Sequence, residues 1–312
     1  MRVLVTGASG FVGRRLVESL LNDRVPVRIL TRNTNPMPAR LGSDQVEVAV
    51  GDLTVAPSLA GAVAGCEVVY HIAGEIFNPA VMWAVNKEGT DHLLEASGKA
   101  GVKRFIYLSS VGVIGTKGNV DRVDESTPSR PRNLYEKSKH AGEIAALRSH
   151  DDGGMQVISV RPSTVYGEER RGSRDSFLAW VRLIKSGRFV LFGRKCVNSC
   201  VYVGDVVAAC RFVERTPGSG GESFIVNESI SLNLFADEMA GLLGVRKAPV
   251  LPEAAGSLAA GLLRMTGRFG TLCNRTVFSM DKLNRLGFTM PFAYQNGLRK
   301  TLEWYREQGR LG

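Results

Sequence analysis

The first thirteen residues constrain the fold of this chain more than any other stretch. Residues 1–6 have the apolar, β-branched pattern of a short strand, and an amphipathic helical pattern covers 14–21. Between them stand Gly7, Gly10 and Gly13. We expect Gly7 to permit a tight turn, Gly10 to let a pyrophosphate approach the backbone, and Gly13 to let the helix pack closely on the sheet. Because free amides at a helix N-terminus attract negative charge, this stretch predicts a dinucleotide-binding turn rather than an ordinary glycine-rich loop.

Strand and helix patterns alternate along the first half of the chain. Further strands are expected over 25–31, 45–50, 67–72, 104–108 and 155–160. This alternation predicts an α/β fold with a Rossmann-type, doubly wound parallel sheet, in which ligands bind outside the carboxyl ends of the strands. After residue 162 the pattern is less regular. We therefore assign 1–162 to an NAD(P)-binding Rossmann domain and 163–312 to a smaller C-terminal substrate-binding lobe, from which about 200–227 return to the Rossmann core.

Charge and hydropathy narrow the choice of partners. The formal net charge of +10 suits a small anionic ligand. The basic residues are scattered, without a long run or interleaved aromatic residues, which argues against nucleic-acid binding. No apolar run reaches the length of a membrane span. We interpret the longest apolar stretch, 254–263, as a helix that lines a cavity or an interface.

The five cysteines indicate a reducing environment. They are Cys66, Cys196, Cys200, Cys210 and Cys273. The odd number, the lack of a C-x-x-C pair and the lack of a secretory segment before the first strand predict reduced thiols and a cytoplasmic location. Cys196 and Cys200 have no nearby Cys or His partners, so no metal site is expected.

The end of the second expected strand bears on the type of dinucleotide. An acidic residue there usually takes the ribose hydroxyl, but this sequence has Thr31 and Arg32. A guanidinium can pair with a 2′-phosphate instead, which favours NADP over NAD, although Arg32 can equally be a solvated loop cation. Asp52 is placed either to accept a hydrogen bond from the adenine amine or to cap a turn.

A tyrosine and a lysine stand one helical turn apart where catalysis would be expected. Tyr135 and Lys139 share one face of the helical pattern over 133–148. A lysine so close, together with a cationic nicotinamide ring, is expected to lower the pKa of the phenol, which then takes a proton from an alcohol or gives one to a carbonyl. Ser110 ends the preceding strand and is placed to hydrogen-bond the same oxygen. Elsewhere such a pair is usually a surface contact; here it lies inside a nucleotide-binding fold.

Together these segments resemble the extended short-chain dehydrogenases/reductases of the NAD(P)-dependent epimerase/dehydratase family. The motifs that carry the resemblance run nearly end to end: TGASGFVG at 6–13, GDL at 51–53, HIAG at 71–74, VNKEGT at 85–90, LSS at 108–110, YEKSK at 135–139, RPSTVYG at 161–167, VYVGDV at 201–206 and DKLNRLGF at 281–288.

The resemblance implies roles for individual residues. Ser110, Tyr135 and Lys139 would form a catalytic triad. Asn86 would support the active-site strand and helix, and homodimers that pair two helices from each subunit would be usual. The residues expected to contact the cofactor are Gly7, Ser9, Gly10, Phe11, Val12, Gly13, Arg32, Asp52, Leu53, Ile72, Ala73, Gly74, Asn86, Tyr135, Lys139, Arg161 and Pro162.

Departures from the family pattern bear on the substrate. Val111 and Gly112 stand where dehydratases carry Asp-Glu, so dehydration is not expected. An arginine that often meets the diphosphate of a nucleotide sugar is replaced by the stretch 198–200, which reads Asn-Ser-Cys. Candidate substrate contacts are Glu75, Ser110, Val111, Tyr166 and Arg275. His71, at the end of a buried strand, is expected to be a packed residue rather than a catalytic one.

Three functions remain open at this stage. The first is hydride transfer to or from a secondary alcohol or ketone of a nucleotide sugar, which the family resemblance favours. The second is the same chemistry on a hydrophobic carbinol such as a hydroxysteroid or dihydroflavonol, as Arg32 and the stretch 254–263 indicate. The third is a non-catalytic dinucleotide-binding scaffold, against which the intact Ser-Tyr-Lys set argues. The sequence does not distinguish reduction, oxidation and epimerisation.

Overall fold

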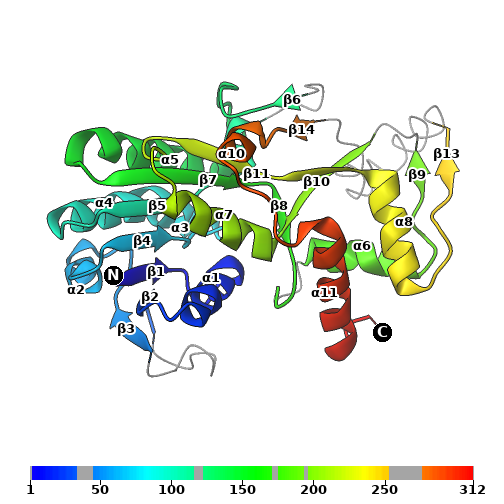
Figure 1. Cartoon of the computed structure of the whole chain (residues 1–312), viewed down its shortest axis with the longest axis horizontal. Helices are drawn as coiled ribbons and strands as arrows, with labels where there is room; N and C mark the ends of the chain where they lie inside the picture. Colours follow the sequence, from blue (N-terminus) through cyan, green and yellow to red (C-terminus); the bar gives the residue numbers. More distant parts are fainter. Residues whose placement is uncertain are drawn as a thin grey trace.

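A seven-stranded, entirely parallel sheet forms the larger part of the computed structural model. The structure describes residues 2–33, 45–115, 122–170, 175–192, 196–252 and 276–311. The strand order is β11-β7-β5-β4-β1-β2-β3, and the sheet lies on the left of Figure 1. Its strands are β1 Val3–Thr6, β2 Val27–Thr31, β3 Val46–Val50, β4 Val68–His71, β5 Arg104–Leu108, β7 Gln156–Pro162 and β11 Ser223–Val226. The predicted Rossmann-type fold is confirmed.

The strand order reverses next to β1. The chain goes outward from β1 through β2 to β3, then returns to place β4 on the other side of β1, with Thr6 opposite His71. In open parallel sheets, ligands bind in the crevice at such a switch point. The glycine turn after β1 and the loop after β4 both open into it.

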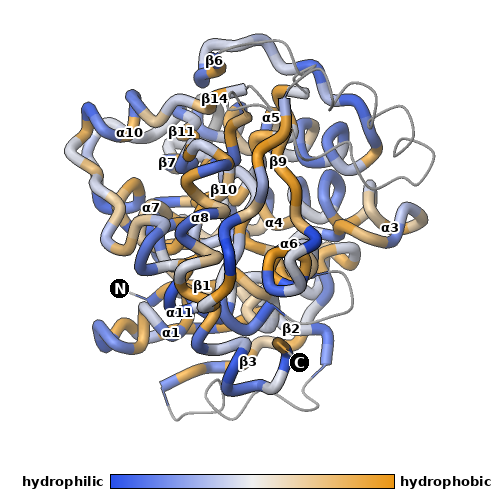
Figure 2. Tube along the Cα trace, turned by 90° about the vertical axis from the view of Figure 1, so that its right-hand side faces the viewer, coloured by the Kyte–Doolittle hydropathy of each residue, from blue (hydrophilic) through white to orange (hydrophobic). Residues whose placement is uncertain are grey.

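Alternating side chains build a core on each face of the sheet. Val3 and Val5 pack into one cluster and Leu4 into the other, because successive side chains of a strand point to opposite faces. The first cluster includes residues of α1 Phe11–Asn22, α7 Val203–Arg215 and α10 Asp281–Arg285. The second includes residues of α2 Ala60–Val63, α4 Gly89–Lys99 and α5 Leu134–Gly153. Hydrophobic segments accordingly lie among the strands inside the molecule (Figure 2).

The helix predicted over about 80–100 is interrupted. It consists of α3 Pro79–Trp83, a wider π-helical turn over Ala84–Glu88, and α4. Inside the π turn, the carbonyl of Asn86 accepts a hydrogen bond from the Thr90 hydroxyl at 2.8 Å. A Cβ on Gly142 of α5 would lie 2.4 Å from this carbonyl oxygen, so α5 packs unusually close to the π turn. Such turns are frequent at functional sites.

A second lobe lies to the right in Figure 1. A small sheet, in the order β12-β10-β8, packs with three helices around its own aromatic-rich core. The strands are β8 Thr164–Tyr166, β10 Val197–Tyr202 and β12 Glu228–Ser231, and the helices are α6 Ser176–Lys185, α8 Leu232–Leu243 and α11 Ala293–Glu307. Short strand pairs join β9 Leu191–Phe192 to β13 Val250–Leu251 and β6 Arg122–Val123 to β14 Val277–Phe278.

Two expectations drawn from composition can be compared with the structure. Cys66, Cys200 and Cys210 are free, buried thiols, whereas Cys196 is disulfide-bonded, which corrects the expectation for that residue. Across the described ranges, no helix combines the length and the apolar character needed to cross a membrane. The apolar stretch 254–263 lies outside the described residues.

Candidate active site

The glycine turn has the geometry that a pyrophosphate requires. Gly7 adopts φ +70°, a left-handed conformation, and a Cβ there would lie 2.7 Å from the Ala73 nitrogen. A Cβ on Gly13 would lie 2.1 Å from the Gly7 oxygen, so only glycine lets α1 begin this close to the turn. No side chain caps the first turn of α1, which leaves its amides available to an anion. The residues present therefore fit a dinucleotide.

Arg32 and Asp52 lie at the end of the site where β2 and β3 finish. Arg32 is exposed directly after β2. Hydrogen bonds from the Thr54 amide and hydroxyl, each 2.8 Å from Oδ1, lower the pKa of Asp52, and the charge of Arg32 acts in the same direction. Of the two interpretations of Asp52, the structure shows the turn cap.

Two predicted substrate contacts have other partners. Oε1 of Glu75 accepts hydrogen bonds from the amides of residues 76, 77 and 78 at 2.7–3.0 Å, so this carboxylate closes its own loop. The Tyr166 ring is completely buried and stacks on Phe177, with ring centroids 4.5 Å apart. The Tyr166 ring thus belongs to the core of the second lobe, and its contact with a substrate stays a prediction. Arg275 lies outside the described residues, and Val111 is partly exposed beside Ser110.

Local capping fixes the start of α5 and thereby the position of Tyr135. The Asn133 side chain accepts a hydrogen bond from the Glu136 amide at 2.8 Å, and Glu136 in turn accepts one from the Arg132 amide at 2.7 Å. Tyr135 thus stands in the first turn, and Lys139 follows one turn later.

The structure brings Ser110 and Tyr135 together. Oγ of Ser110 accepts a hydrogen bond from the Gly112 amide at 3.1 Å, which leaves the serine O–H free to donate. A side-chain hydrogen bond between Ser110 and Tyr135 lowers the pKa of the phenol, although burial has the larger effect and raises it. Ser110 therefore lies beside Tyr135 and favours its phenolate, while the predicted hydrogen bond of Ser110 to a substrate oxygen stays a prediction.

Lys139 is buried almost completely. Burial lowers the pKa of Lys139 to about 7, with Glu143 acting weakly in the opposite direction. Its Nζ lies 4.1 Å from the centre of the Tyr107 ring, and the Tyr107 hydroxyl donates a hydrogen bond to the Lys139 carbonyl oxygen at 3.2 Å. Desolvation is the largest influence on the pKa of both Lys139 and Tyr135, so a lowering of the Tyr135 pKa by Lys139 together with a nicotinamide ring stays a prediction.

Asn86 links the loop after β4 to α5. Its Oδ1 accepts a hydrogen bond from the Glu75 amide at 2.7 Å, and its Nδ2 donates to the Glu75 carbonyl at 2.8 Å and to the Ser138 hydroxyl at 3.0 Å. A Cβ on Gly74 would meet Asn86 Oδ1 at 3.4 Å and Lys139 Nζ at 3.8 Å. The side chain of Asn86 is therefore used within the protein and supports the site from behind.

Sequence reasoning missed a buried ion pair behind the site. The Nε and Nη2 atoms of Arg161 donate to the two carboxylate oxygens of Glu143 at 2.8 and 3.0 Å, and the Ser159 hydroxyl also contacts this carboxylate. Only Nη1 of the buried Arg161 is left without a partner, so the structure ties most of its guanidinium to α5 rather than leaving it to a cofactor. The signal in the sequence was that Glu143 stands four residues after Lys139, which places both side chains on the same face of the helix.

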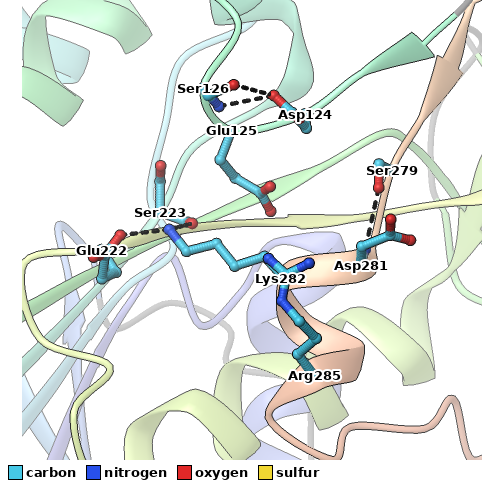
Figure 3. Close-up of a pocket in the computed structure, with 9 residues that line it drawn as sticks. All are labelled: Asp124, Glu125, Ser126, Glu222, Ser223, Ser279, Asp281, Lys282 and Arg285. Carbon is cyan, nitrogen blue, oxygen red and sulfur yellow. Dashed lines mark hydrogen bonds and ion pairs between the residues drawn. The ribbon is translucent and has the colours of Figure 1, made fainter.

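A polar cavity of about 430 Å³ lies along the outer edge of β11 and contains none of the predicted site residues. Figure 3 shows Lys282 reaching toward Glu222 and Ser223. Lys282 donates to the Ser223 carbonyl at 3.0 Å, and Glu125 accepts from the Ile225 amide at 2.8 Å. These side chains hydrogen-bond backbone groups at the open edge of β11, which edge strands leave unpaired. We therefore assign them a structural role rather than a catalytic one.

A glycine turn at the switch point and a Ser–Tyr pair beside a buried lysine define a Rossmann-fold protein built for dinucleotide chemistry. Residues 3–227 match the model of the NAD dependent epimerase/dehydratase family. The chain therefore belongs to this family and is an NAD(P)-dependent enzyme.

The relatives include both hydroxysteroid dehydrogenases and sugar epimerases. The chain is 32% identical to the 3 beta-hydroxysteroid dehydrogenase/Delta 5-->4-isomerase of Mycobacterium tuberculosis, with 97% of this chain and 90% of the relative covered. It is 28% identical to the N-acetyl-alpha-D-glucosaminyl-diphospho-ditrans,octacis-undecaprenol 4-epimerase of Escherichia coli O157:H7, with 97% and 94% covered. Among solved structures, UDP-glucose 4-epimerase of Thermus thermophilus in complex with NAD has a TM-score of 0.76 and 25% identity, with 98% and 99% covered.

Proposed function

We propose that this enzyme moves hydride between NAD(P) and a secondary alcohol or ketone, with Tyr135 as the group that moves the proton. The observation that carries the proposal is the contact of Ser110 with Tyr135 beside buried Lys139. The amides of the glycine turn, with Arg32, would hold the dinucleotide, which supplies the hydride acceptor or donor.

Each side chain then has a defined task. Tyr135 as phenolate takes the proton from the substrate hydroxyl, and as phenol gives one to the carbonyl oxygen in the reverse direction. The Ser110 hydroxyl donates a hydrogen bond to the oxygen where charge develops. When Lys139 is protonated, its positive charge stabilises the Tyr135 phenolate. Because the pKa of Lys139 is about 7, a charge that binds nearby will change the protonation of Lys139 at neutral pH.

Replacement of Tyr135 by Phe tests the catalytic role. We expect turnover to fall by about 10²–10⁴-fold with dinucleotide affinity nearly unchanged, because the phenol oxygen serves the chemical step. Steady-state kinetics and a fluorescence titration with NADPH measure the two effects. Lys137→Met, at an exposed position on the same helix, is the control and should leave both turnover and affinity unchanged. Activity that survives Tyr135→Phe would support the scaffold alternative.

We further propose NADP rather than NAD as the preferred dinucleotide. The support is the exposed guanidinium of Arg32 directly after β2 and the lack of a carboxylate at Thr31. Fluorescence titration should give tighter binding of NADPH than of NADH, and Arg32→Asp should reverse this order. Equal affinities of the unmodified enzyme for NADPH and NADH would mean that Arg32 does not select NADP.

For the substrate we propose a nucleotide sugar, as the name of the UDP-glucose 4-epimerase of Thermus thermophilus indicates for that enzyme. Hydroxysteroids are the second candidate, and one observation favours them. The Asn198 side chain is buried and bonds to Cys200, and the Ser199 hydroxyl donates to the Thr276 carbonyl, so 198–200 present no cation to a diphosphate. A screen of nucleotide sugars and of 3β-hydroxysteroids for NAD(P)H formation or consumption, with epimer analysis by NMR, decides between the two classes.

We also propose that the enzyme is a homodimer. Helices α3 and α5 pack together, and several large apolar side chains on them and on the loop before them are exposed: Ile76, Phe77, Val81, Trp83, Leu134 and Ile144. Such a cluster is typical of an interface. Light scattering after gel filtration should give twice the chain mass, and Trp83→Glu should yield monomers. A cytoplasmic location and the division at residue 162 stay predictions from the sequence.

A further inference from the structure

A continuous chain of buried hydrogen bonds runs behind the site from the glycine turn to the catalytic helix. Thr6 Oγ1 lies 2.7 Å from Nδ1 of His71, and Nε2 of His71 lies 3.0 Å from Thr90 Oγ1. The Thr90 hydroxyl donates to the Asn86 carbonyl at 2.8 Å. Asn86 Nδ2 donates to Ser138 Oγ at 3.0 Å, and the Ser138 hydroxyl donates to the Tyr135 carbonyl at 2.9 Å. These side chains are at most 1% exposed, apart from Tyr135 at the end of the chain.

The hydrogen bond from the Thr90 hydroxyl to the Asn86 carbonyl favours one assignment of donors and acceptors in this chain. The Thr90 proton is committed to the Asn86 carbonyl, so Thr90 Oγ1 must accept from His71, which therefore carries its proton on Nε2. Nδ1 of His71 is then an acceptor and takes the Thr6 hydroxyl proton. Thr6 Oγ1 remains free to accept from the Ala73 amide, which lies 3.3 Å away.

The charge environment keeps His71 neutral. Burial lowers the pKa of His71 to about 3, and the charge of Lys139 acts in the same direction. The rings of Phe105 and Tyr107 enclose the imidazole at centroid distances of 5.8 and 5.6 Å. A second proton would place two donors, Nδ1–H and the Ala73 amide, against the same Thr6 oxygen.

We propose that His71 is a positioning residue whose single neutral tautomer connects the dinucleotide turn to the helix that carries Tyr135. One end of the chain holds Thr6, immediately before Gly7, and the Ala73 amide against which Gly7 packs. The other end holds the first turn of α5 through Asn86 and Ser138. This inference rests on the proposed hydride transfer, and it adds that dinucleotide binding and proton transfer are coupled through His71.

Nitrogen-15 NMR of the histidine rings tests the tautomer without any turnover. The chain has four histidines, and His71→Asn identifies the signal. We expect the Nε2–H form of His71 in the full-length protein, unchanged from pH 5 to pH 9. An Nδ1–H tautomer, or titration within this range, would overturn the proposal. The result does not depend on the fate of Tyr135→Phe, so failure of the proposed function and failure of this inference are distinguishable.

Variants at Thr90 test the coupling. Thr90→Val keeps the shape but removes the hydroxyl, leaving His71 Nε2–H and the Asn86 carbonyl without partners. We expect Thr90→Val to lose the single tautomer, to weaken NADPH binding and to lower kcat, each by about tenfold, since a buried unsatisfied donor is costly. Thr90→Ser returns the hydroxyl, so it should restore the single tautomer of His71. It should also bring NADPH affinity and kcat back to within about twofold of the unmodified protein.

Tyr107→Phe is the matched control. It removes the neighbouring hydroxyl that also interacts with Thr90 and should leave the His71 tautomer unchanged. Equal behaviour of Thr90→Val and Thr90→Ser, or a tautomer change in Tyr107→Phe, contradicts the proposed coupling. Should Thr90→Val fail to fold, the NMR of the unmodified protein and of Thr90→Ser still decides the assignment.

Discussion

The buried ammonium of Lys139 makes the stability of this protein depend on pH in a predictable way. In the folded protein burial lowers the pKa of Lys139 from its ordinary 10.5 to about 7. In the unfolded chain the side chain keeps its ordinary pKa. Between these two pH values the unfolded state binds more protons than the folded state, so the free energy of unfolding rises with pH. Below pH 7 both states are protonated and the full penalty applies.

The magnitude follows from the two pKa values. At about 1.4 kcal/mol per pKa unit, the step from 10.5 to about 7 corresponds to about 5 kcal/mol in total. Over the experimentally convenient range from pH 7 to pH 9.5, about 3 kcal/mol of this should appear. Replacing Lys139 by Met removes the ionisable group and keeps the apolar stem against Tyr107.

Urea denaturation followed by circular dichroism, without added dinucleotide, measures the effect. We expect Lys139→Met to be more stable than the unmodified protein at pH 7, with the difference shrinking by about 3 kcal/mol at pH 9.5. Lys137→Met changes the same charge at an exposed position of α5 and should show a pH-independent difference. Parallel curves for the Lys139→Met variant and the unmodified protein would refute the reasoning, because they would mean that Lys139 titrates alike in the folded and unfolded states.

Three further perturbations follow from packing and hydrogen bonding. Gly13→Ala should abolish NADPH binding in a fluorescence titration, since its Cβ would lie 2.1 Å from the Gly7 oxygen. The control Gly98→Ala, whose Cβ meets open space, should bind NADPH normally and raise the free energy of unfolding by up to about 1 kcal/mol. Glu143→Gln should cost about 3–5 kcal/mol in urea denaturation by leaving Arg161 buried without its counter-charge; a loss below about 1 kcal/mol would contradict this. Glu125→Ala should cost about 1–3 kcal/mol by exposing the edge of β11, and Glu125→Gln, which keeps the acceptor, should recover most of it.

Much of the fold follows from local patterns in the sequence. The Rossmann-type sheet was predictable because β-branched runs, turn glycines and helical periodicity are signals of short range. The glycine turn was likewise predictable, since Gly7 and Gly13 are required by backbone geometry within a few residues. The proximity of Tyr135 and Ser110 could be anticipated because Ser110 follows a strand and Tyr135 begins the helix that comes after it, at the ligand-binding edge of a parallel sheet.

The electrostatics of the site were decided only by the tertiary structure. The sequence shows Lys139 one turn from Tyr135, but not that desolvation is the largest influence on the pKa of each. Tyr166 follows a strand end like the other site residues, yet packing in the second lobe buries its ring. The His71–Thr90 contact joins residues 19 positions apart, and Thr6 lies 65 positions from His71. Spacing along the chain carries no information about such contacts, because they exist only once the strands and the π turn are packed together.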